Sequence, residues 1–232
     1  MTWWKYPEFS SFLGRNYYKS NMEKAIRQSN KIIVPSISIK NDLVENFSLS
    51  ESLVEVIAHG NSLPKGIIKS PHKPYFLSVG TVEPRKNLDF YAQAIKQSGL
   101  QKDFDFIHIG RTGWGKIPSE LQHKTNTSDQ ELANYIANAT AVVVPSEYEG
   151  FGLPVLEAHF QNTPVILSND AALKELSLPI DNVFGLGDIN QLIESLKIKS
   201  QNLSKFTEKD FQDSLNLTWD KSALQHANLY RE

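Results

Sequence analysis

Two acidic residues flank a glycine-rich turn in the stretch EYEGFGLPVLEA, residues 147–158. Pro154 suits the first turn of a helix, so we expect a short helix that carries Glu157 about one turn from its start. Glu149 then lies in the preceding loop, where a carboxylate can accept hydrogen bonds from the hydroxyl groups of a sugar. In this functional interpretation, Glu149 contacts a sugar beside the turn.

Both acids also have a structural interpretation. In that interpretation, Glu149 caps the N-terminus of the helix, and Glu157 satisfies backbone groups near the helix base. Gly150 and Gly152, between the acids, allow positive φ and close approach of a ligand to the backbone. This stretch by itself leaves both interpretations open.

A second candidate site is TVEPRKN, where Arg85 and Lys86 directly precede a predicted helix. Two cations at the positive end of a helix dipole form a good site for a dianion such as a pyrophosphate. The alternative is a solvated basic pair bridged to Glu83.

A third candidate is RTGWG, where three glycines, Gly110, Gly113 and Gly115, surround Trp114. Their spacing matches neither the dinucleotide-binding fingerprint nor a P-loop. We expect a flexible loop packed by Trp114, and a loop that approaches a ligand is the alternative.

Strands and helices must position these residues. Short, almost continuously apolar runs alternate with helical patterns, as expected for parallel strands that are covered on both faces. This alternation predicts an α/β fold with a Rossmann-like, doubly wound parallel sheet, whose ligands lie beyond the carboxyl ends of the strands. The predicted strands are KIIVP (31–35), VEVIA (54–58), YFLSVG (75–80), DFIHIG (105–110), AVVVP (141–145) and PVILS (164–168).

Two helices are well delimited. Asn87 is the expected N-cap and Gly99 the expected end of the first. Ser128 and Glu131 form the capping box that opens the second. The side chains expected to face the core on these helices are Leu88, Tyr91, Ala92, Ile95, Leu132, Tyr135 and Ile136.

The segment 60–74 holds two glycines and three prolines, which predicts a linker. Before it we expect helices near 17–30 and 39–47 with two strands, too little for an independent sheet. The expected domains are therefore 1–68, an incomplete N-terminal remnant with the linker; 69–215, the main sheet domain; and 216–232, a closing helix.

The composition is that of a globular protein, with 40% hydrophobic and 22% charged residues among 232. The formal charge of -2 gives no support for non-specific nucleic-acid binding. The absence of cysteine excludes disulfides and thiolate metal sites. No apolar run is long enough to span a membrane, and no signal peptide is recognisable. Trp3 and Trp4 either anchor at a membrane interface or cover the edge of a core or a partner surface.

Four stretches in order, FLSVGTVEPRKNLDFYAQAI, FIHIGRTGWG, SDQELANYIANATAVVVPSEYEGFGLPVLEA and NTPVILSND, resemble the retaining glycosyltransferases of family 4, which have the GT-B fold. The glutamate pair around EGFGLP is the most specific element. SNKIIVPSISIKNDLVENF resembles the end of that family's N-terminal domain, and LTWDKSALQHANLY resembles its closing helix. The resemblance covers nearly all of the chain.

This resemblance implies a donor that is a UDP-, GDP- or dTDP-sugar, an acceptor that is a glycan or lipid-linked glycan, and no cofactor or catalytic metal. Arg85 and Lys86 would bind the diphosphate, Glu149 the hydroxyls of the transferred sugar, and Glu157 the ribose. The further donor-binding positions are Gly80, Thr81 and the turn residues Gly150, Phe151, Gly152 and Leu153. The resemblance also implies a role in polysaccharide biosynthesis, in the cytoplasm or at the inner face of the membrane.

Two departures from the family pattern stand out. Most of the N-terminal domain has no counterpart, so we expect a partner chain that supplies it, or self-association. Asn162 stands where the family has glycine, which predicts a changed turn. The alternative function is a non-catalytic nucleotide-sugar-binding module or a partner subunit of a split transferase. A GT-B epimerase or phosphorylase fits EGFGLP and EPRKN less well.

Overall fold

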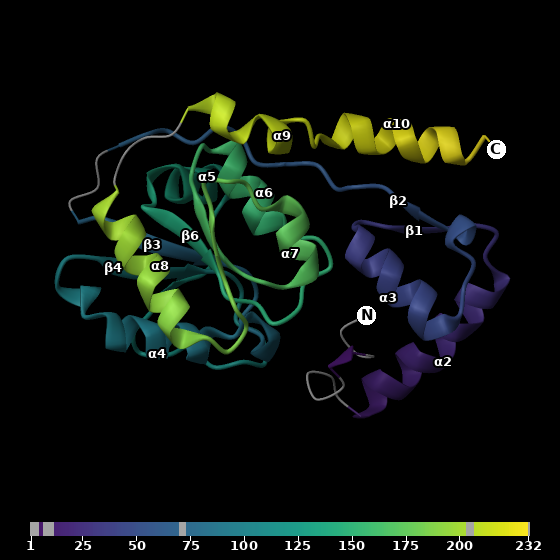
Figure 1. The fold of residues 1–232 in the computed structure, drawn as a ribbon, viewed down its shortest axis with the longest axis horizontal. Coiled ribbons are helices and arrows are strands. Elements are labelled where there is room, and N and C mark those ends of the chain that lie inside the picture. Colours follow the sequence, from purple (N-terminus) through teal and green to yellow (C-terminus); the bar gives the residue numbers. More distant parts are fainter. Residues whose placement is uncertain (1–4, 7–11, 70–72, 203–206, 232) are drawn as a thin grey trace.

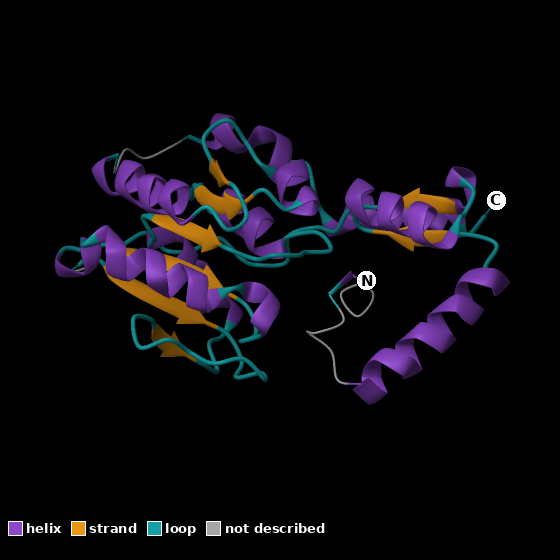
Figure 2. Cartoon of the chain, turned by 60° about the horizontal axis from the view of Figure 1, so that its bottom comes forward, coloured by secondary structure: helices purple, strands orange, loops and turns teal. Residues whose placement is uncertain are grey.

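A computed structural model of the chain describes residues 5–6, 12–69, 73–202 and 207–231 (Figure 1). Trp3 and Trp4 lie outside these described residues. Two separate groups of strands are visible, a larger sheet and a two-stranded one (Figure 2).

The larger sheet contains six strands, all parallel, in the order β5-β4-β3-β6-β7-β8. Its order reverses between β3 and β6, so the loops that follow these two neighbouring strands meet at the switch point. The strands are β3 (Tyr75–Val79), β4 (Asp105–Ile109), β5 (Gln122–Lys124), β6 (Ala141–Val144), β7 (Val165–Ser168) and β8 (Asn182–Phe184).

Helices cover both faces of this sheet (Figure 1). Consecutive strand residues, such as Phe76 and Leu77, belong to different apolar clusters, because successive side chains point to opposite faces. Helices α4 (Leu88–Ser98) and α8 (Ile189–Gln201) pack on the Phe76 face. Helices α5 (Asp129–Asn138), α6 (Leu153–Phe160) and α7 (Ala171–Leu176) pack on the Leu77 face. The predicted doubly wound parallel α/β sheet is therefore confirmed.

The N-terminal part forms a small unit of its own. Strands β1 (Ile32–Val34) and β2 (Val54–Val56) pair in parallel, and α2 (Phe12–Gln28) and α3 (Ile37–Phe47) accompany them. A third apolar cluster fills this unit and includes Tyr148, which comes from the glycine-rich turn of the main domain. The N-terminal unit thus packs directly against the candidate site.

The C-terminal elements are α9 (Gln212–Leu215) and α10 (Trp219–Leu229). From α9, beside the larger sheet, the chain continues into α10, which extends toward the small sheet (Figure 1). Thr218 forms a parallel bridge with Asn61, and a Cβ at Gly60 would lie 2.0 Å from Trp219 N. The chain between the two sheets therefore packs tightly against the start of α10.

The core-facing predictions for α4 are confirmed, since its four named residues are buried. In α5, Ile136 is buried, and Leu132 and Tyr135 are partly buried against the same cluster. The Ser128–Glu131 capping box is present. Asn87 occupies the N-cap position of α4, but its side chain makes no capping hydrogen bond.

Two expectations need correction. Strands β5 and β8 carry polar residues at the sheet edges, and their sequences lack the continuous apolar pattern that identified the other strands. The predicted linker has no regular secondary structure, yet its described part is fastened to the main domain. Leu63 is buried in the core, and Gln161 bonds both Pro64 O and Gly66 N.

Asn162 adopts the left-handed conformation, with φ of 59°, and its Oδ1 is buried without a hydrogen-bond partner among the described residues. Glycine adopts the left-handed conformation without strain and has no side-chain oxygen to leave unpaired. Asn162→Gly is therefore expected to raise the free energy of unfolding by about 1 kcal/mol. Thermal unfolding should show a melting temperature roughly 2–4 °C higher.

Asn126→Gly is the matched control, because Asn126 has φ of 56° but an exposed side chain. Its melting temperature should rise less than that of Asn162→Gly. A lower melting temperature for Asn162→Gly would contradict the expectation.

Candidate functional site

The loops after β3 and β6 meet, as expected from the strand order. The backbone N–H of Glu147, after β6, donates to the carbonyl of Arg85, after β3, at 2.9 Å. The short 3-10 helix Pro84–Lys86 carries both cations of the predicted basic pair. Loop residues that are more than 60 positions apart in the sequence therefore share one site.

Glu149 lies between the two cations. Its Oε1 accepts from Lys86 Nζ at 2.6 Å and from Ser146 Oγ at 2.7 Å. Its Oε2 accepts from Arg85 Nη1 at 2.9 Å. We refer to Arg85, Lys86, Ser146 and Glu149 as the Glu149 cluster.

Within the Glu149 cluster, Lys86 and Glu149 are nearly shielded from water, each 7% exposed, and the Arg85 side chain is 22% exposed. Burial alone would raise the pKa of Glu149, but Lys86 and Arg85 outweigh it and hold that pKa below its ordinary value. Arg85 also pairs with Glu83, at 2.8 Å. The bridge to Glu83 is thus confirmed, but the interpretation as a solvated basic pair is wrong.

Gly80 allows the Lys86 ammonium to lie against the backbone. A Cβ at Gly80 would stand 3.0 Å from Lys86 Cε and 3.2 Å from its Nζ, and the φ of 141° also favours glycine. Thr81 follows Gly80 in the same loop and is half-buried. The structure therefore brings Gly80, Arg85 and Lys86 together with Glu149, and Thr81 lies next to Gly80.

The glycine-rich turn opens α6. Gly152 is the N-cap residue with φ of 103°, and a Cβ there would lie 2.7 Å from Leu173 Cδ2. Gly150 has no positive φ, contrary to expectation. Glu149 does not cap α6. No described residue accepts a hydrogen bond from the backbone N–H of Phe151, Gly152 or Leu153, so these amides are available to an anion.

Glu157 lies on α6 and is half-buried. Its carboxylate makes no hydrogen bond or ion pair with a described residue, so the interpretation that it satisfies backbone groups has no support. Burial, together with the nearby charge of Asp129, raises its pKa from 4.5 to about 7, and Lys86 opposes the shift. Among the described residues, Glu157 thus has no hydrogen-bond or ion-pair partner, although the charges of Lys86 and Asp129 both act on it.

Glu157→Gln is expected to stabilise the ligand-free protein at pH 8 by roughly 2 kcal/mol and to have little effect at pH 5. The folded-state pKa is raised, so the folded protein binds more protons than the unfolded chain between pH 4.5 and 7. Stability contributed by the protonated acid is therefore lost as pH rises through about 7, and glutamine avoids that loss.

Thermal unfolding of both proteins across this pH range tests the expectation. Glu194→Gln, at an exposed position of α8, is the control and should show no such pH-dependent difference. Equal melting temperatures of wild type and Glu157→Gln at pH 8 would contradict the proposed desolvation of Glu157.

The loop after β4 differs from expectation. Trp114 is 65% exposed, so it does not pack the loop. The glycines instead allow close backbone contact, since a Cβ at Gly113 would lie 2.4 Å from Val82 O. The loop after β4 is therefore held against the loop after β3.

The N-terminal unit holds the outer side of the glycine-rich turn. Ser36 Oγ donates to Gly150 O at 2.8 Å, and Tyr148 Oη donates to Asp42 Oδ2 at 3.0 Å. Tyr6 Oη donates to Glu147 O at 3.3 Å. Sequence reasoning missed these contacts, because they join residues more than 100 positions apart.

Glu175 of α7 makes a further contact between the main domain and the N-terminal unit. Its carboxylate accepts from the backbone N–H groups of Ile37 and Ser38, at 2.9 and 2.6 Å, at the start of α3. An anion at this end of α3 is stabilised by the free amides and by the helix dipole.

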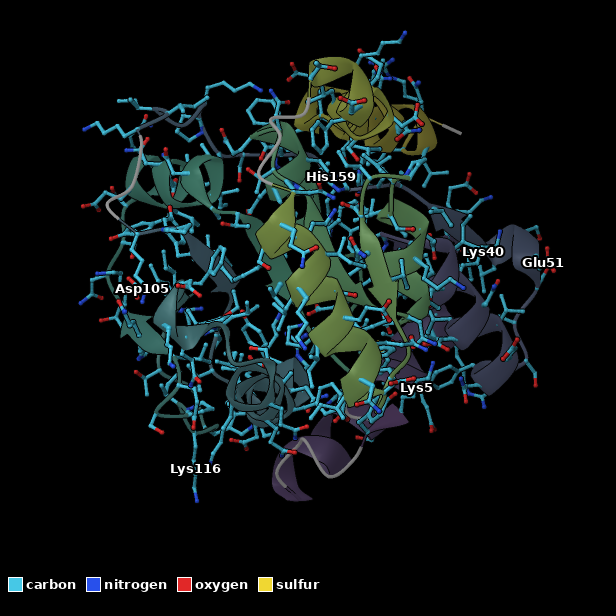
Figure 3. The ribbon with its side chains drawn as sticks, turned by 60° about the vertical axis from the view of Figure 1, so that its left-hand side comes forward. Lys5, Lys40, Glu51, Asp105, Lys116 and His159 are labelled. Carbon is cyan, nitrogen blue, oxygen red and sulfur yellow. The ribbon has the colours of Figure 1, made fainter. Side chains whose placement is uncertain are left out.

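A second cluster that the sequence did not reveal contains His159, Asp181 and Ser214. The His159 ring lies 2.9 Å from Asp181 Oδ2 and 2.7 Å from Ser214 Oγ. Figure 3 shows His159 inside the protein, whereas Lys116 extends into solvent. All three side chains are buried, so this Ser-His-Asp arrangement has no access to a substrate and joins α6, α9 and the segment before β8.

Within the described residues, no three or more His, Cys, Asp or Glu side chains form a group suited to a metal ion. None of the helices in the same residues has the length and apolar character that crossing a membrane requires.

Known proteins resemble this chain in sequence and in fold. Residues 62–182, more than half of the chain, match the family model described as glycosyl transferases group 1. The O-antigen chain mannosyltransferase RfbU of Salmonella typhimurium is 28% identical over 74% of the chain and 50% of its own length. An uncharacterized glycosyltransferase of Methanocaldococcus jannaschii is 30% identical over 96% of the chain and 64% of its length.

The fold is that of the Rossmann-like domains in GT-B glycosyltransferases. The crystal structure of Anabaena HepE in complex with UDP-glucose superimposes with a TM-score of 0.76, covering 97% of this chain and 69% of HepE, at 15% identity. The chain spans about half the length of RfbU.

Proposed function

Because the chain belongs to the glycosyl transferases group 1 family, we propose that it binds a nucleotide-diphosphate sugar in the Glu149 cluster and takes part in transferring the sugar to a glycan acceptor. We assign it to the family 4 type, with retention of configuration, on the resemblance of its EGFGLP and EPRKN stretches. The observation that carries the proposal is the convergence of Arg85, Lys86 and Glu149 at the switch point of the sheet.

Each part of the donor has a matching group near the cluster. Lys86 and Arg85 neutralise the diphosphate, supported by the free amides at the start of α6. Glu149 takes the hydroxyls of the transferred sugar. Glu157 takes the ribose, because its carboxylate makes no hydrogen bond or ion pair with a described residue and a diol can supply the missing donors.

The chemistry needed from these groups is electrostatic. As the sugar leaves, negative charge grows on the diphosphate, and preorganised cations and amides stabilise that charge. The buried surroundings strengthen the effect, because fixed charges act more strongly where water is excluded. In this proposal the leaving phosphate helps to deprotonate the acceptor on the same face of the sugar, which retains configuration.

A mannosyl donor is our first choice of substrate. The support comes from relatives such as RfbU, which is named for transfer of mannose to O-antigen chains. A glucosyl donor comes second, since HepE shares the fold and was crystallised with UDP-glucose. The acceptor we propose is a growing glycan or lipid-linked glycan.

A non-catalytic module remains the alternative function, but the relatives do not favour it, since RfbU is itself named as a transferase. A partner chain that completes the acceptor side remains a proposal as well.

A binding screen tests the proposal. Thermal shift and calorimetry of the chain with GDP-mannose, UDP-glucose and dTDP-rhamnose should identify one donor that binds in the micromolar range and raises the melting temperature. Product formed from that donor should keep the anomeric configuration in an NMR spectrum. If none of these donors, nor GDP or UDP, binds, the proposed function is wrong.

A further inference from the structure

A buried histidine next to the Glu149 cluster has no role in the function proposed above. His108 of β4 is only 1% exposed. Its Nε2 lies 2.9 Å from the carbonyl oxygen of Gly80, and its Nδ1 lies 2.8 Å from Ser78 Oγ. The ring therefore lies between two residues at the carboxyl end of β3.

Chemistry fixes the protonation of this ring. Burial, with smaller contributions from nearby His123 and Lys86, lowers the pKa of His108 to about 4, against the opposing effect of the Gly80 hydrogen bond. The ring is therefore neutral near pH 7 and carries one N–H. Since a carbonyl oxygen can only accept, Nε2 carries the hydrogen and Nδ1 accepts from the Ser78 hydroxyl.

The hydrogen bond sets the direction of one peptide group. All described peptide bonds are trans, so the N–H of Thr81 points opposite to the C=O of Gly80. The Gly80 C=O points toward β4, and Gly110 closes over it, since a Cβ at Gly110 would overlap the Gly80 oxygen. The Thr81 N–H therefore points toward β6, the neighbour of β3 on the other side.

The backbone pairing around Thr81 gives the same direction independently. Gly80 N–H donates to Ile109 O at 2.9 Å, and Val82 N–H donates to Arg111 O at 3.0 Å. Residues on each side of Thr81 thus pair with β4 and the loop after it, and in an extended segment the N–H between them faces the other way. No residue in the described part of the chain accepts a hydrogen bond from the Thr81 N–H.

The side that this amide faces is the side of the Glu149 cluster. The loop after β6 contains Ser146 and Glu149, and Lys86 Nζ lies close to Gly80 as well as to Glu149. The amide and the ammonium group therefore converge on one place, and both are donors that suit a phosphate oxygen.

We infer that His108 is a positioning residue that fixes the Gly80–Thr81 peptide, so that the Thr81 N–H serves beside Lys86 as a donor to a phosphate oxygen of the nucleotide ligand. This inference rests on the proposed function for its ligand. Its new content is the assignment of His108, which touches the ligand only through the peptide that it holds.

Calorimetry of the full chain with GDP, UDP and dTDP tests the inference, using whichever binds the wild type most tightly. His108→Leu removes the ring N–H, and its dissociation constant is expected to rise about tenfold. His108→Gln keeps an N–H that can reach Gly80, and it should stay within about threefold of wild type. Phe106→Leu is the control for stability, because Phe106 is buried on the same face of β4 and packs on Phe76 and Tyr91.

The Thr81 amide gives a readout that a purely structural role of His108 would not produce. In a ¹⁵N-labelled chain its resonance should shift strongly on addition of the nucleotide in wild type and His108→Gln, and much less in His108→Leu. No Thr81 shift in the wild type, equal binding by wild type and His108→Leu, or equal losses in both His108 variants would overturn the inference. An equal loss in Phe106→Leu would also overturn it, whereas a wild type that binds none of the three nucleotides points to failure of the proposed function itself.

Discussion

Glu149→Ala is expected to lower the free energy of unfolding of the ligand-free protein by about 3 kcal/mol, because the change leaves Arg85 and Lys86 close together without their shared carboxylate. Removing one partner of a buried pair costs more than the pair itself contributes, since the remaining charge stays desolvated. Chemical denaturation at pH 7 measures the change. Glu194→Ala, at an exposed position, is the control and should change little.

A nucleoside diphosphate should stabilise the same variant more strongly than it stabilises the wild type. In the ligand-free protein, the Glu149 carboxylate competes with a diphosphate for both cations. Without it, GDP or UDP should bind at least as tightly as to the wild type, and the rise in melting temperature should be larger.

A nucleotide sugar should behave differently, because it also loses the sugar contact of Glu149. Its affinity relative to the free nucleoside diphosphate should fall about tenfold or more in Glu149→Ala. If the nucleoside diphosphate and the nucleotide sugar weaken by the same factor, Glu149 has no contact with the sugar and its role must be reassigned.

The second large effect is expected for Lys86→Met. Methionine keeps the apolar stem but removes the ammonium group that lies 2.6 Å from Glu149, so the diphosphate faces a carboxylate with one cation fewer. The dissociation constant for the nucleoside diphosphate should rise at least about 30-fold, as calorimetry at constant ionic strength can show.

Lys96→Met provides the matched control, since Lys96 is exposed in the last turn of α4 and the net charge changes equally. It should bind as the wild type does. If Lys86→Met bound the nucleoside diphosphate with unchanged affinity, the diphosphate would not bind at the Glu149 cluster.

The sequence was most informative where one local pattern determines the structure. Apolar runs such as AVVVP become buried central strands, because a strand covered on both faces needs apolar residues at every position. The meeting of Arg85, Lys86 and Glu149 was predictable from their positions after two strands, since the carboxyl ends of parallel strands share one edge.

Tertiary contacts limited the remaining predictions. β5 is polar throughout and β8 is only three residues long, so only their pairing with neighbouring strands at the sheet edges reveals them. Whether Arg85 and Lys86 were solvated or buried depended on Glu149, more than 60 positions away. The hydrogen bonds that join Ser36 and Asp42 to the glycine-rich turn could not be predicted from any local sequence pattern.

The most direct measurement is a crystal structure of the chain with the nucleoside diphosphate that binds it best. The diphosphate should lie within hydrogen-bond distance of Lys86 Nζ and the amides at the start of α6, with the ribose at Glu157. A well-ordered nucleotide bound elsewhere, with Lys86 and Glu149 still paired only to each other, would contradict the assignment of this cluster as the donor site.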